Sequence, residues 1–231
     1  ESELKSDDKL TNLLATIPNI PDAAAPIGKD ENDNIEIEKF STPKEFSFTP
    51  KSHYELGEDL KMLDFEQSAV ISGARFSTLN SDLAKLERAL SNFMLDLAGE
   101  CDFTEVSPPN LVKSDAMYGS GQLPKFSDDA FAIDNGDFWL IPTAEVSLVN
   151  LVAKKTLSED DLPLRFTAYT PCFRREAGSY GKEVRGLNRL HQFDKVEIVQ
   201  IQHPEESYKT LEMMVTHVAN ILDELELPYK I

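Results

Sequence analysis

Residues 170–197 read TPCFRREAGSYGKEVRGLNRLHQFDKVE, a pattern that predicts a strand, a glycine-rich loop and a returning strand. Side chains two residues apart on a strand point to the same face of a sheet. We therefore expect Arg174 and Glu176 to share one face, and Phe193 and Glu197 to share a face on the returning strand. Charged groups lose their hydration when they are buried, so this set predicts either mutual pairing or a bound ligand.

Two explanations of the charged hairpin are open. Arg174 and Glu176 could form a surface ion pair on an exposed strand, where charged residues usually lie. The three glycines in the loop and a second guanidinium at Arg189 favour an anion site, because guanidinium groups bind phosphate and carboxylate oxygens in pairs. Phe193 is either a core residue or a platform on which a base can stack.

The composition places the hairpin in a globular, acidic chain. The 231 residues are 41% hydrophobic, and their formal net charge of −18 argues against a protein that coats nucleic acid nonspecifically. The charge is uneven: residues 1–67 carry 16 acidic and 7 basic side chains, whereas residues 165–195 carry 7 basic and 3 acidic ones. A local cationic patch of this kind suits a nucleotide or one end of an RNA.

Cysteine spacing and hydropathy exclude several classes. The two cysteines, Cys101 and Cys172, form no metal-ligand or redox spacing. No apolar run is long enough to span a bilayer, and the first residues do not resemble a signal peptide, so we expect a cytoplasmic protein without a membrane partner. The phosphate loop GxxxxGK[S/T] and the dinucleotide motif GxGxxG are both absent.

The rest of the chain predicts strands joined by turns and flanked by helices. Apolar residues recur every three or four positions from Leu79 to Ala98, which predicts an amphipathic helix. Asn135-Gly136 between two apolar runs predicts a hairpin, and a second helix is expected to begin near Pro204. Further strands are expected at residues 103–106, 164–168, 172–176 and 192–201. The fold class is therefore α+β, an antiparallel sheet flanked by helices.

Two further sites are ambiguous from spacing alone. Thr143, Ala144 and Glu145 follow Pro142 at an expected strand-to-helix transition, where helix capping already favours Thr and Glu. Glu197 lies among strand-core residues, so its carboxylate is either paired within the fold or reserved for an ammonium group. His191 is expected to be a core histidine, because no second His or Cys is spaced to share a metal with it.

The hairpin resembles motif 2 of class II aminoacyl-tRNA synthetases, in the form carried by bacterial-type seryl-tRNA synthetases. Other segments resemble that family in the family's order: residues 17–21, 71–76, 118–126, 140–146 and 160–164. The resemblance runs from about Leu14 to Ile231 and implies a partial class II synthetase-like catalytic core, truncated at both ends. Residues 1–16 would be the remnant of a helical tRNA-binding arm, residues 17–45 a linker, and residues 46–231 a partial catalytic domain with motifs 1 and 2 but without motif 3.

The resemblance also implies roles for individual residues. Serine would be bound by Thr143, Ala144, Glu145 and Glu197. ATP would be bound by Arg174, Arg175, Glu176, Arg189 and Phe193, of which Arg174 and Glu176 would be catalytic. The acceptor end of tRNA would be contacted by Lys182 and Arg185.

The implied function is serine–tRNA ligation: ATP-dependent activation of L-serine to seryl-adenylate, then transfer to tRNA(Ser). ATP would enter with Mg²⁺, no structural metal is expected, and a homodimer would form through the motif 1 helix and strand. Because motif 3 is missing, we expect the chain alone to be inactive in serine-dependent pyrophosphate exchange. Two alternatives are a non-catalytic synthetase-like protein used for dimerisation or regulation, and a freestanding module that binds serine or a nucleotide without RNA.

Overall fold

The computed structural model describes residues 9–177 and 186–231, which fall into two compact units. One unit comprises residues 1–48 with 213–231, and the other comprises residues 49–212. The boundary lies within helix α7 (Ser207–Glu224), which follows the short helix η7 (Pro204–Glu206) as Pro204 predicts.

The N-terminal part of the first unit contains little regular structure. Residues 9–14 are helical, and most of the chain from there to β1 (Lys39–Phe40) is irregular apart from η1 (Glu31–Asp33). Strand β1 pairs antiparallel with β10 (Tyr229–Lys230), and the rings of Phe40 and Tyr229 stack with their centroids 5.2 Å apart. The pairing joins the segment around residue 40 to the C-terminal residues of the described chain within this unit.

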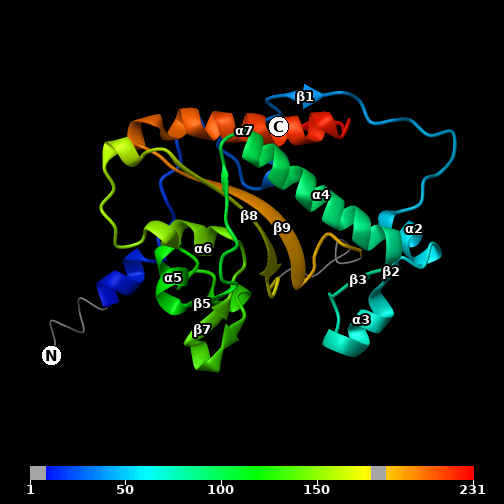
Figure 1. Cartoon of the computed structure of the whole chain (residues 1–231), viewed down its shortest axis with the longest axis horizontal. Coiled ribbons are helices and arrows are strands. Elements are labelled where there is room, and N and C mark those ends of the chain that lie inside the picture. The colour runs from blue at the N-terminus through cyan, green and yellow to red at the C-terminus, as the bar shows by residue number, and fades with distance from the viewer. Residues whose placement is uncertain (1–8, 178–185) are drawn as a thin grey trace. The chain divides into compact units, whose positions relative to one another are not determined.

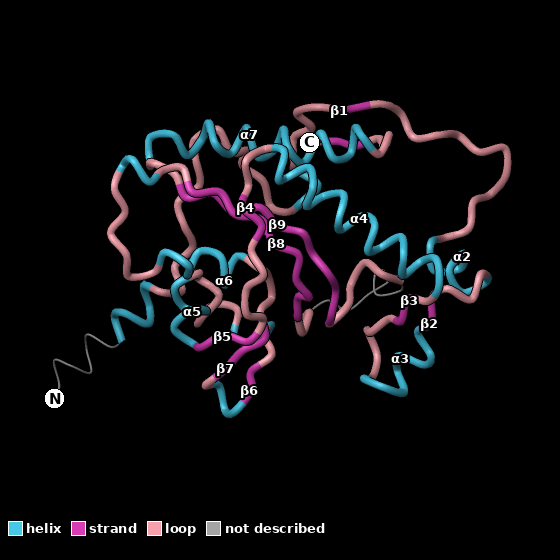
Figure 2. The backbone as a smooth tube through the Cα atoms, viewed as in Figure 1, coloured by secondary structure: helices cyan, strands magenta, loops and turns pink. Residues whose placement is uncertain are grey.

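The second unit is built on a long antiparallel hairpin. Strands β8 (Leu164–Phe173) and β9 (Gln192–Ile201) pair along their whole length (Figure 1). Strand β4 (Thr104–Glu105) adds to the other edge of β8 and runs parallel to it, so the strand order is β4-β8-β9 (Figure 2). The expected α+β fold is confirmed, with one parallel pair in its main sheet.

Two expectations about β8 were wrong. Residues 164–168 and the start of 172–176 belong to one continuous strand. Pro171 can lie within it because β4 pairs only with Phe166 and Thr167, which leaves an edge where a missing N–H is tolerated. The strand ends at Phe173, and Glu176 has a left-handed φ of 50°, so Arg174 and Glu176 do not share a strand face.

Helix α4 (Ser81–Glu100) is the amphipathic helix predicted from spacing, and it begins two residues later than Leu79. The reason is that β3 (Thr78–Leu79) pairs with β2 (Leu63–Asp64) before the helix starts. On β8, Tyr169 reaches Glu87 of α4, whereas the adjacent Ala168 packs in a cluster with residues of α6 (Glu145–Val149). Since neighbouring residues of a strand point to opposite faces, α4 and α6 cover opposite faces of the sheet.

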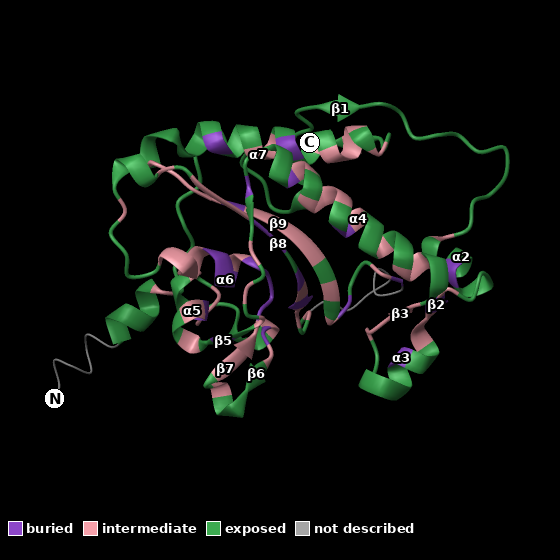
Figure 3. Ribbon diagram, in the orientation of Figure 1, coloured by how far each residue is buried: buried purple, intermediate pink, exposed green. Residues whose placement is uncertain are grey.

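A second sheet carries the predicted Asn-Gly hairpin. Strands β6 (Ala132–Ile133) and β7 (Phe138–Leu140) pair across η3 (Asp134–Gly136), and β7 also pairs with β5 (Leu111–Lys113). Buried residues of this sheet and its neighbours form one hydrophobic cluster: Val112, Met117, Ala130, Ile141 and Val146. In Figure 3 buried residues are purple, and α6 carries several of them. The remaining elements are α2 (His53–Asp59), α3 (Phe65–Ser72), α5 (Ser114–Gly119), η2 (Ser127–Asp129), η4 (Asn150–Val152) and η5 (Glu159–Asp161).

Candidate active site

The segment between β7 and α6 is tied to the end of β8. The backbone N–H of Phe173 donates to the carbonyl of Ile141 at 2.9 Å, and that of Ile141 donates to the carbonyl of Asn110 at 3.0 Å. These bonds hold Thr143, which begins the turn into α6, beside the sheet face that carries Glu197. Residues 54 positions apart in sequence thus enter one site.

Thr143 lies at the centre of a small polar network. Its hydroxyl donates to Glu197 Oε2 at 2.5 Å and accepts from Lys195 Nζ at 2.7 Å. The Lys195 ammonium also pairs with Glu197 Oε2 at 2.9 Å, and the backbone N–H of Glu145 lies 3.3 Å from the same oxygen. The Lys195 and Glu197 side chains are 30% and 16% exposed, so the pair is largely shielded from water and interacts more strongly than a surface pair.

Glu145 is a second carboxylate beside this network. Burial raises its pKa, the negative charge of Glu197 raises it further, and the positive charge of Lys195 lowers it. Two carboxylates brought together in a partly dry site repel each other unless cations lie nearby. The site therefore favours a cationic group close to Glu145 and Glu197.

Arg174 supplies a cation at the mouth of the same site. Its Nε donates to the carbonyl of Pro142 at 3.2 Å, and its guanidinium carbon lies 5.2 Å from the centroid of the Phe193 ring. Cation–π contact with the ring and the bond to the carbonyl fix the plane of the guanidinium. The backbone is held as well, because Arg174 N donates to the carbonyl of His191 at 2.9 Å. A guanidinium held in this way is suited to bind phosphate or carboxylate oxygens.

Glu176 is held by contacts of both its side chain and its backbone. Its carboxylate pairs with Arg189 at 3.2 Å, and its carbonyl accepts from Arg75 NH1 at 3.2 Å. The Glu176 side chain is only 11% exposed, whereas that of Arg189 is 47% exposed. Glu176 and Arg189 therefore pair through the loop after β8 and not through the strand itself, while the Arg174 side chain contacts Pro142 and Phe193.

Two pockets flank this part of the sheet. The smaller has a volume of about 290 Å³ and is lined by Gln122, Phe126, Asp129, Ala130, Pro142, Thr143, Glu145, Arg174 and Lys195. Its size lies near the lower end of the range for small-molecule sites, roughly 300–1,000 Å³. It brings carboxylates and cations together around one small volume, so it suits a small ligand that carries both charges.

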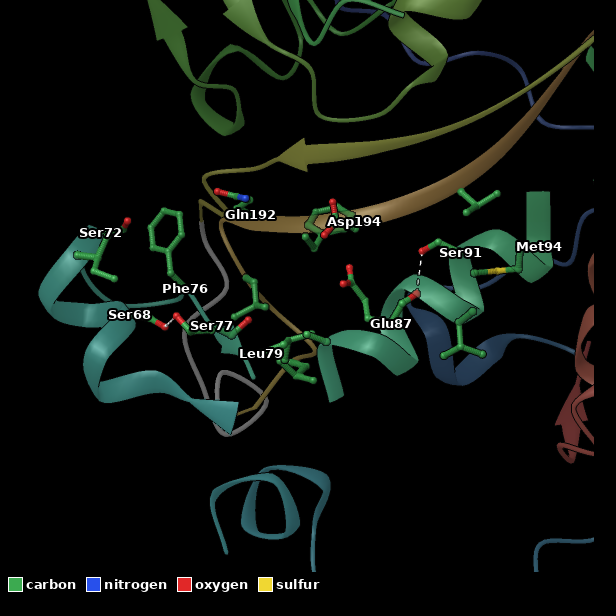
Figure 4. Close-up of a pocket in the computed structure, with 18 residues that line it drawn as sticks. Ser68, Ser72, Phe76, Ser77, Leu79, Glu87, Ser91, Met94, Gln192 and Asp194 are labelled. Atoms are coloured by element: carbon green, nitrogen blue, oxygen red, sulfur yellow. Dashed lines mark hydrogen bonds between the residues drawn. The ribbon is translucent and has the colours of Figure 1, made fainter. Parts of the chain in front are cut away.

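The larger pocket, of about 670 Å³, lies between α4, α3 and β9. In Figure 4, the Glu87 side chain rises from α4 toward Asp194 on β9, with Phe76, Leu79 and Met94 around them. Burial and the neighbouring Asp194 raise the pKa of Glu87. Phe193, the ring expected to stack on adenine, lines this larger pocket and not the smaller one, and it contacts Arg174, which lines the smaller one.

The other residues expected in the site are distributed differently. Ala144 is fully buried and packs in the cluster with Leu148 and Ala168, so its side chain belongs to the hydrophobic core beside the site. Arg175 is exposed, and its backbone N–H donates to the carbonyl of Asp129 at 2.8 Å. Lys182 and Arg185, expected to contact tRNA, lie outside the described residues.

The sequence patterns did not point to Lys195 or to several other residues that line the smaller pocket. A signal for Lys195 was available, because Phe193, Lys195 and Glu197 alternate along β9 and therefore share one face. Gln122, Phe126 and Asp129 come from a loop segment and 3₁₀ turn with no regular spacing to the hairpin, so no local pattern could have placed them in the pocket.

Within residues 9–177 and 186–231, no three side chains of His, Cys, Asp or Glu come together in a way that could hold a metal ion. None of the helices in that part of the chain is both long and apolar enough to cross a lipid bilayer.

Comparison with known proteins assigns the fold. Residues 128–231 match the family model for the tRNA synthetase class II core domain (G, H, P, S and T). The structure of seryl-tRNA synthetase from Pyrococcus horikoshii complexed with ATP superposes with a TM-score of 0.93 at 35% identity, covering 99% of this chain and 56% of that one. The chain therefore has the class II tRNA synthetase core fold.

Within that class the chain is similar to serine–tRNA ligases. It is 54% identical over 226 residues to the serine–tRNA ligase of Sulfurihydrogenibium, a match that covers 97% of this chain and 54% of the relative. It is 55% identical over 220 residues to that of Thermosipho africanus, covering 95% of this chain and 52% of the relative. The chain spans about half the length of the curated relatives it matches.

Proposed function

We propose that this chain carries the amino-acid and α-phosphate sites of a serine–tRNA ligase. The observation that carries the proposal is the set of charges around the smaller pocket, which is lined by Arg174, Lys195 and Glu145 together with Thr143, the hydrogen-bond partner of Glu197. A free amino acid presents an ammonium and a carboxylate, which such a site can bind together. The ATP complex of the Pyrococcus horikoshii protein supports ATP as the second substrate.

The chemistry follows from this arrangement. The serine carboxylate attacks the α-phosphorus of ATP in line, an acyl-phosphate bond forms, and the bond to pyrophosphate breaks. Such a step needs alignment and stabilisation of developing charge more than a protein nucleophile. In this proposal the Arg174 guanidinium contacts both the serine carboxylate and the α-phosphate, and Glu197 holds the ammonium of serine; the support is that Arg174 lines the smaller pocket and is held by the carbonyl of Pro142.

The further roles follow the family resemblance. We propose that Glu176, Arg175 and Arg189 serve the nucleotide, with Mg²⁺ entering as part of the ATP complex, and that adenine stacks on Phe193. Lys182 and Arg185 would contact the acceptor end of tRNA(Ser). We further propose a cytoplasmic homodimer formed through α4 and β4, and assign residues 1–16 to the end of a helical arm and residues 17–45 to a linker.

Ligand binding by the chain as it stands tests the proposal. Calorimetric titration with a non-hydrolysable seryl-sulfamoyl adenosine should show saturable binding, while the alanyl analogue should bind more weakly because it lacks the hydroxyl. Arg174→Gln should weaken binding by roughly ten- to a hundredfold, since hydrogen bonds to charged groups contribute about 1.5–3 kcal/mol. Arg165→Gln, at the other end of β8, is the matched control and should bind like the parent chain. Equal binding of the seryl and alanyl analogues would contradict serine specificity.

A further inference from the structure

Lys195 is held by Thr143 and by Glu197, the residue that the proposed function assigns to the ammonium of serine. Its Nζ lies 2.7 Å from Thr143 Oγ1 and 2.9 Å from Glu197 Oε2. The side chain reaches this position from the middle of β9, and it also lines the smaller pocket. A lysine ammonium and an amino-acid ammonium are chemically the same group, each with three N–H donors.

The two oxygens that hold Lys195, Glu197 Oε2 and Thr143 Oγ1, also take part in other hydrogen bonds. Glu197 Oε2 receives the Thr143 hydroxyl, the Lys195 ammonium and a longer contact at 3.3 Å from the Glu145 backbone N–H. Thr143 Oγ1 accepts from Lys195 and, at 3.4 Å, from the Glu145 backbone N–H. An oxygen has two lone pairs, so another ammonium can bind these two atoms only if a present donor leaves. Of the donors, only Lys195 has a long flexible stem that can move.

We propose that Lys195 occupies the substrate's ammonium site in the unliganded protein and that serine exchanges places with it. The proposal rests on the proposed function, because it takes Thr143 and Glu197 as the serine ammonium site. On binding, the ligand ammonium pairs with Glu197, and the displaced Lys195 ammonium pairs with the ligand carboxylate beside Arg174 in the same pocket. No covalent bond or proton transfer is involved.

The exchange makes Lys195 a specificity-determining residue. With a zwitterionic amino acid, both charges of the Lys195–Glu197 pair find new partners. With an amine that lacks a carboxylate, Lys195 would lose its ion pair with Glu197 and gain no ligand carboxylate in return, which is unfavourable in a partly buried site. The pocket would therefore reject simple amino alcohols, although they carry the same ammonium and hydroxyl as serine.

The test compares L-serine with ethanolamine, which has the ammonium and the hydroxyl of serine but no carboxylate. Both are titrated calorimetrically into the whole chain and into Lys195→Met, which keeps the aliphatic stem without the charge. In the parent chain serine should bind more tightly than ethanolamine. In Lys195→Met the ethanolamine affinity should rise and the serine affinity should not, so that the ratio of their dissociation constants changes by at least tenfold. Lys209→Met removes the same charge from an exposed ion pair on α7 and should leave the ratio unchanged.

The outcomes separate this inference from the proposed function. If the parent chain binds serine and seryl-sulfamoyl adenosine but Lys195→Met changes serine and ethanolamine affinities equally, the exchange is wrong and the function stands. If the parent chain binds neither serine nor the analogue, both proposals fail. Lys195→Arg keeps the charge and should retain the preference for serine. Lys195→Gln repeats the comparison if Lys195→Met does not unfold cooperatively.

Discussion

The Thr143 hydroxyl donates a 2.5 Å hydrogen bond to the Glu197 carboxylate, and the same hydroxyl accepts a 2.7 Å hydrogen bond from Lys195. We call these two hydrogen bonds the Thr143 relay. Thr143 is 5% exposed, so water hardly competes for either bond. One hydroxyl thus orients both the Glu197 carboxylate and the Lys195 ammonium, of which Lys195 lines the smaller pocket. The relay joins the start of α6 to the middle of β9.

Thr143→Val should damage both stability and ligand binding. The substitution preserves shape but removes the hydroxyl, leaving a buried carboxylate with one donor fewer, which costs about 1.5–3 kcal/mol for a bond to a charged group. Urea denaturation followed by circular dichroism should show this loss, and the affinity for seryl-sulfamoyl adenosine should fall by about tenfold or more. Thr143→Ser retains the hydroxyl and should lie close to the parent chain in both measurements. A Val variant as stable as the Ser variant would contradict the relay.

Glu87→Gln should stabilise the fold near neutral pH. Burial, together with the hydrogen bond and the negative charge of Asp194, raises the pKa of Glu87 above its ordinary value. A carboxyl whose pKa is raised on folding binds more protons in the folded state, so stability falls as pH rises from the ordinary glutamate range through the raised value. The stability gained from Glu87→Gln should therefore be present at pH values above the raised pKa of Glu87 and vanish below the ordinary glutamate range.

The pH series is measured by urea denaturation of the parent chain and the Glu87→Gln variant. Asp96→Asn, an exposed acidic residue on the same helix, serves as the control for a change in net charge. Its effect should be small and should not follow the same pH profile. A stability gain for Glu87→Gln that is constant with pH would rule out the raised pKa as its cause.

Gly186→Ala should destabilise the loop that returns to β9. Gly186 has a φ of +95°, and a Cβ there would lie 2.3 Å from His53 Nε2, which accepts a 2.9 Å hydrogen bond from Leu187 N. Left-handed strain alone costs about 1–3 kcal/mol, and displacement of His53 breaks the hydrogen bond. A double-mutant cycle with His53→Ala separates the two effects, because removing the imidazole relieves the clash but not the strain. Full additivity would show that the clash contributes nothing.

The two cysteines should differ sharply in reactivity. Cys172 is fully buried in β8, and burial raises the pKa of its thiol, whereas Cys101 after α4 is exposed. Thiolate is the reactive form, so iodoacetamide should label Cys101 in the native chain and reach Cys172 only after unfolding in urea. Mass spectrometry of the native and unfolded protein reads this directly. Native labelling of Cys172 would show that the β8–β9 hairpin opens under native conditions, and Cys101→Ser provides a background free of the reactive thiol.

The sequence by itself determined the local elements and the class of chemistry. Apolar spacing located α4 to within two residues at its start, Asn135-Gly136 located the β6–β7 hairpin, and the strand expected at residues 192–201 has the bounds of β9. These features depend on neighbours within a few positions, where the period of a helix or strand acts directly. The run of residues 170–197 also carried the family resemblance, and the fold agrees with it.

Only the tertiary structure decided how the site is assembled. It merged two expected strands into β8, moved Glu176 off the strand into a left-handed conformation, and brought Thr143 against Glu197 across 54 positions. It also placed Lys195 between them, a residue whose position on β9 was visible in the sequence but whose partners were not. Local patterns fix which way a side chain leaves its own strand or helix. Which distant groups it meets depends on long-range pairing and packing, because those alone bring separate segments within hydrogen-bond distance.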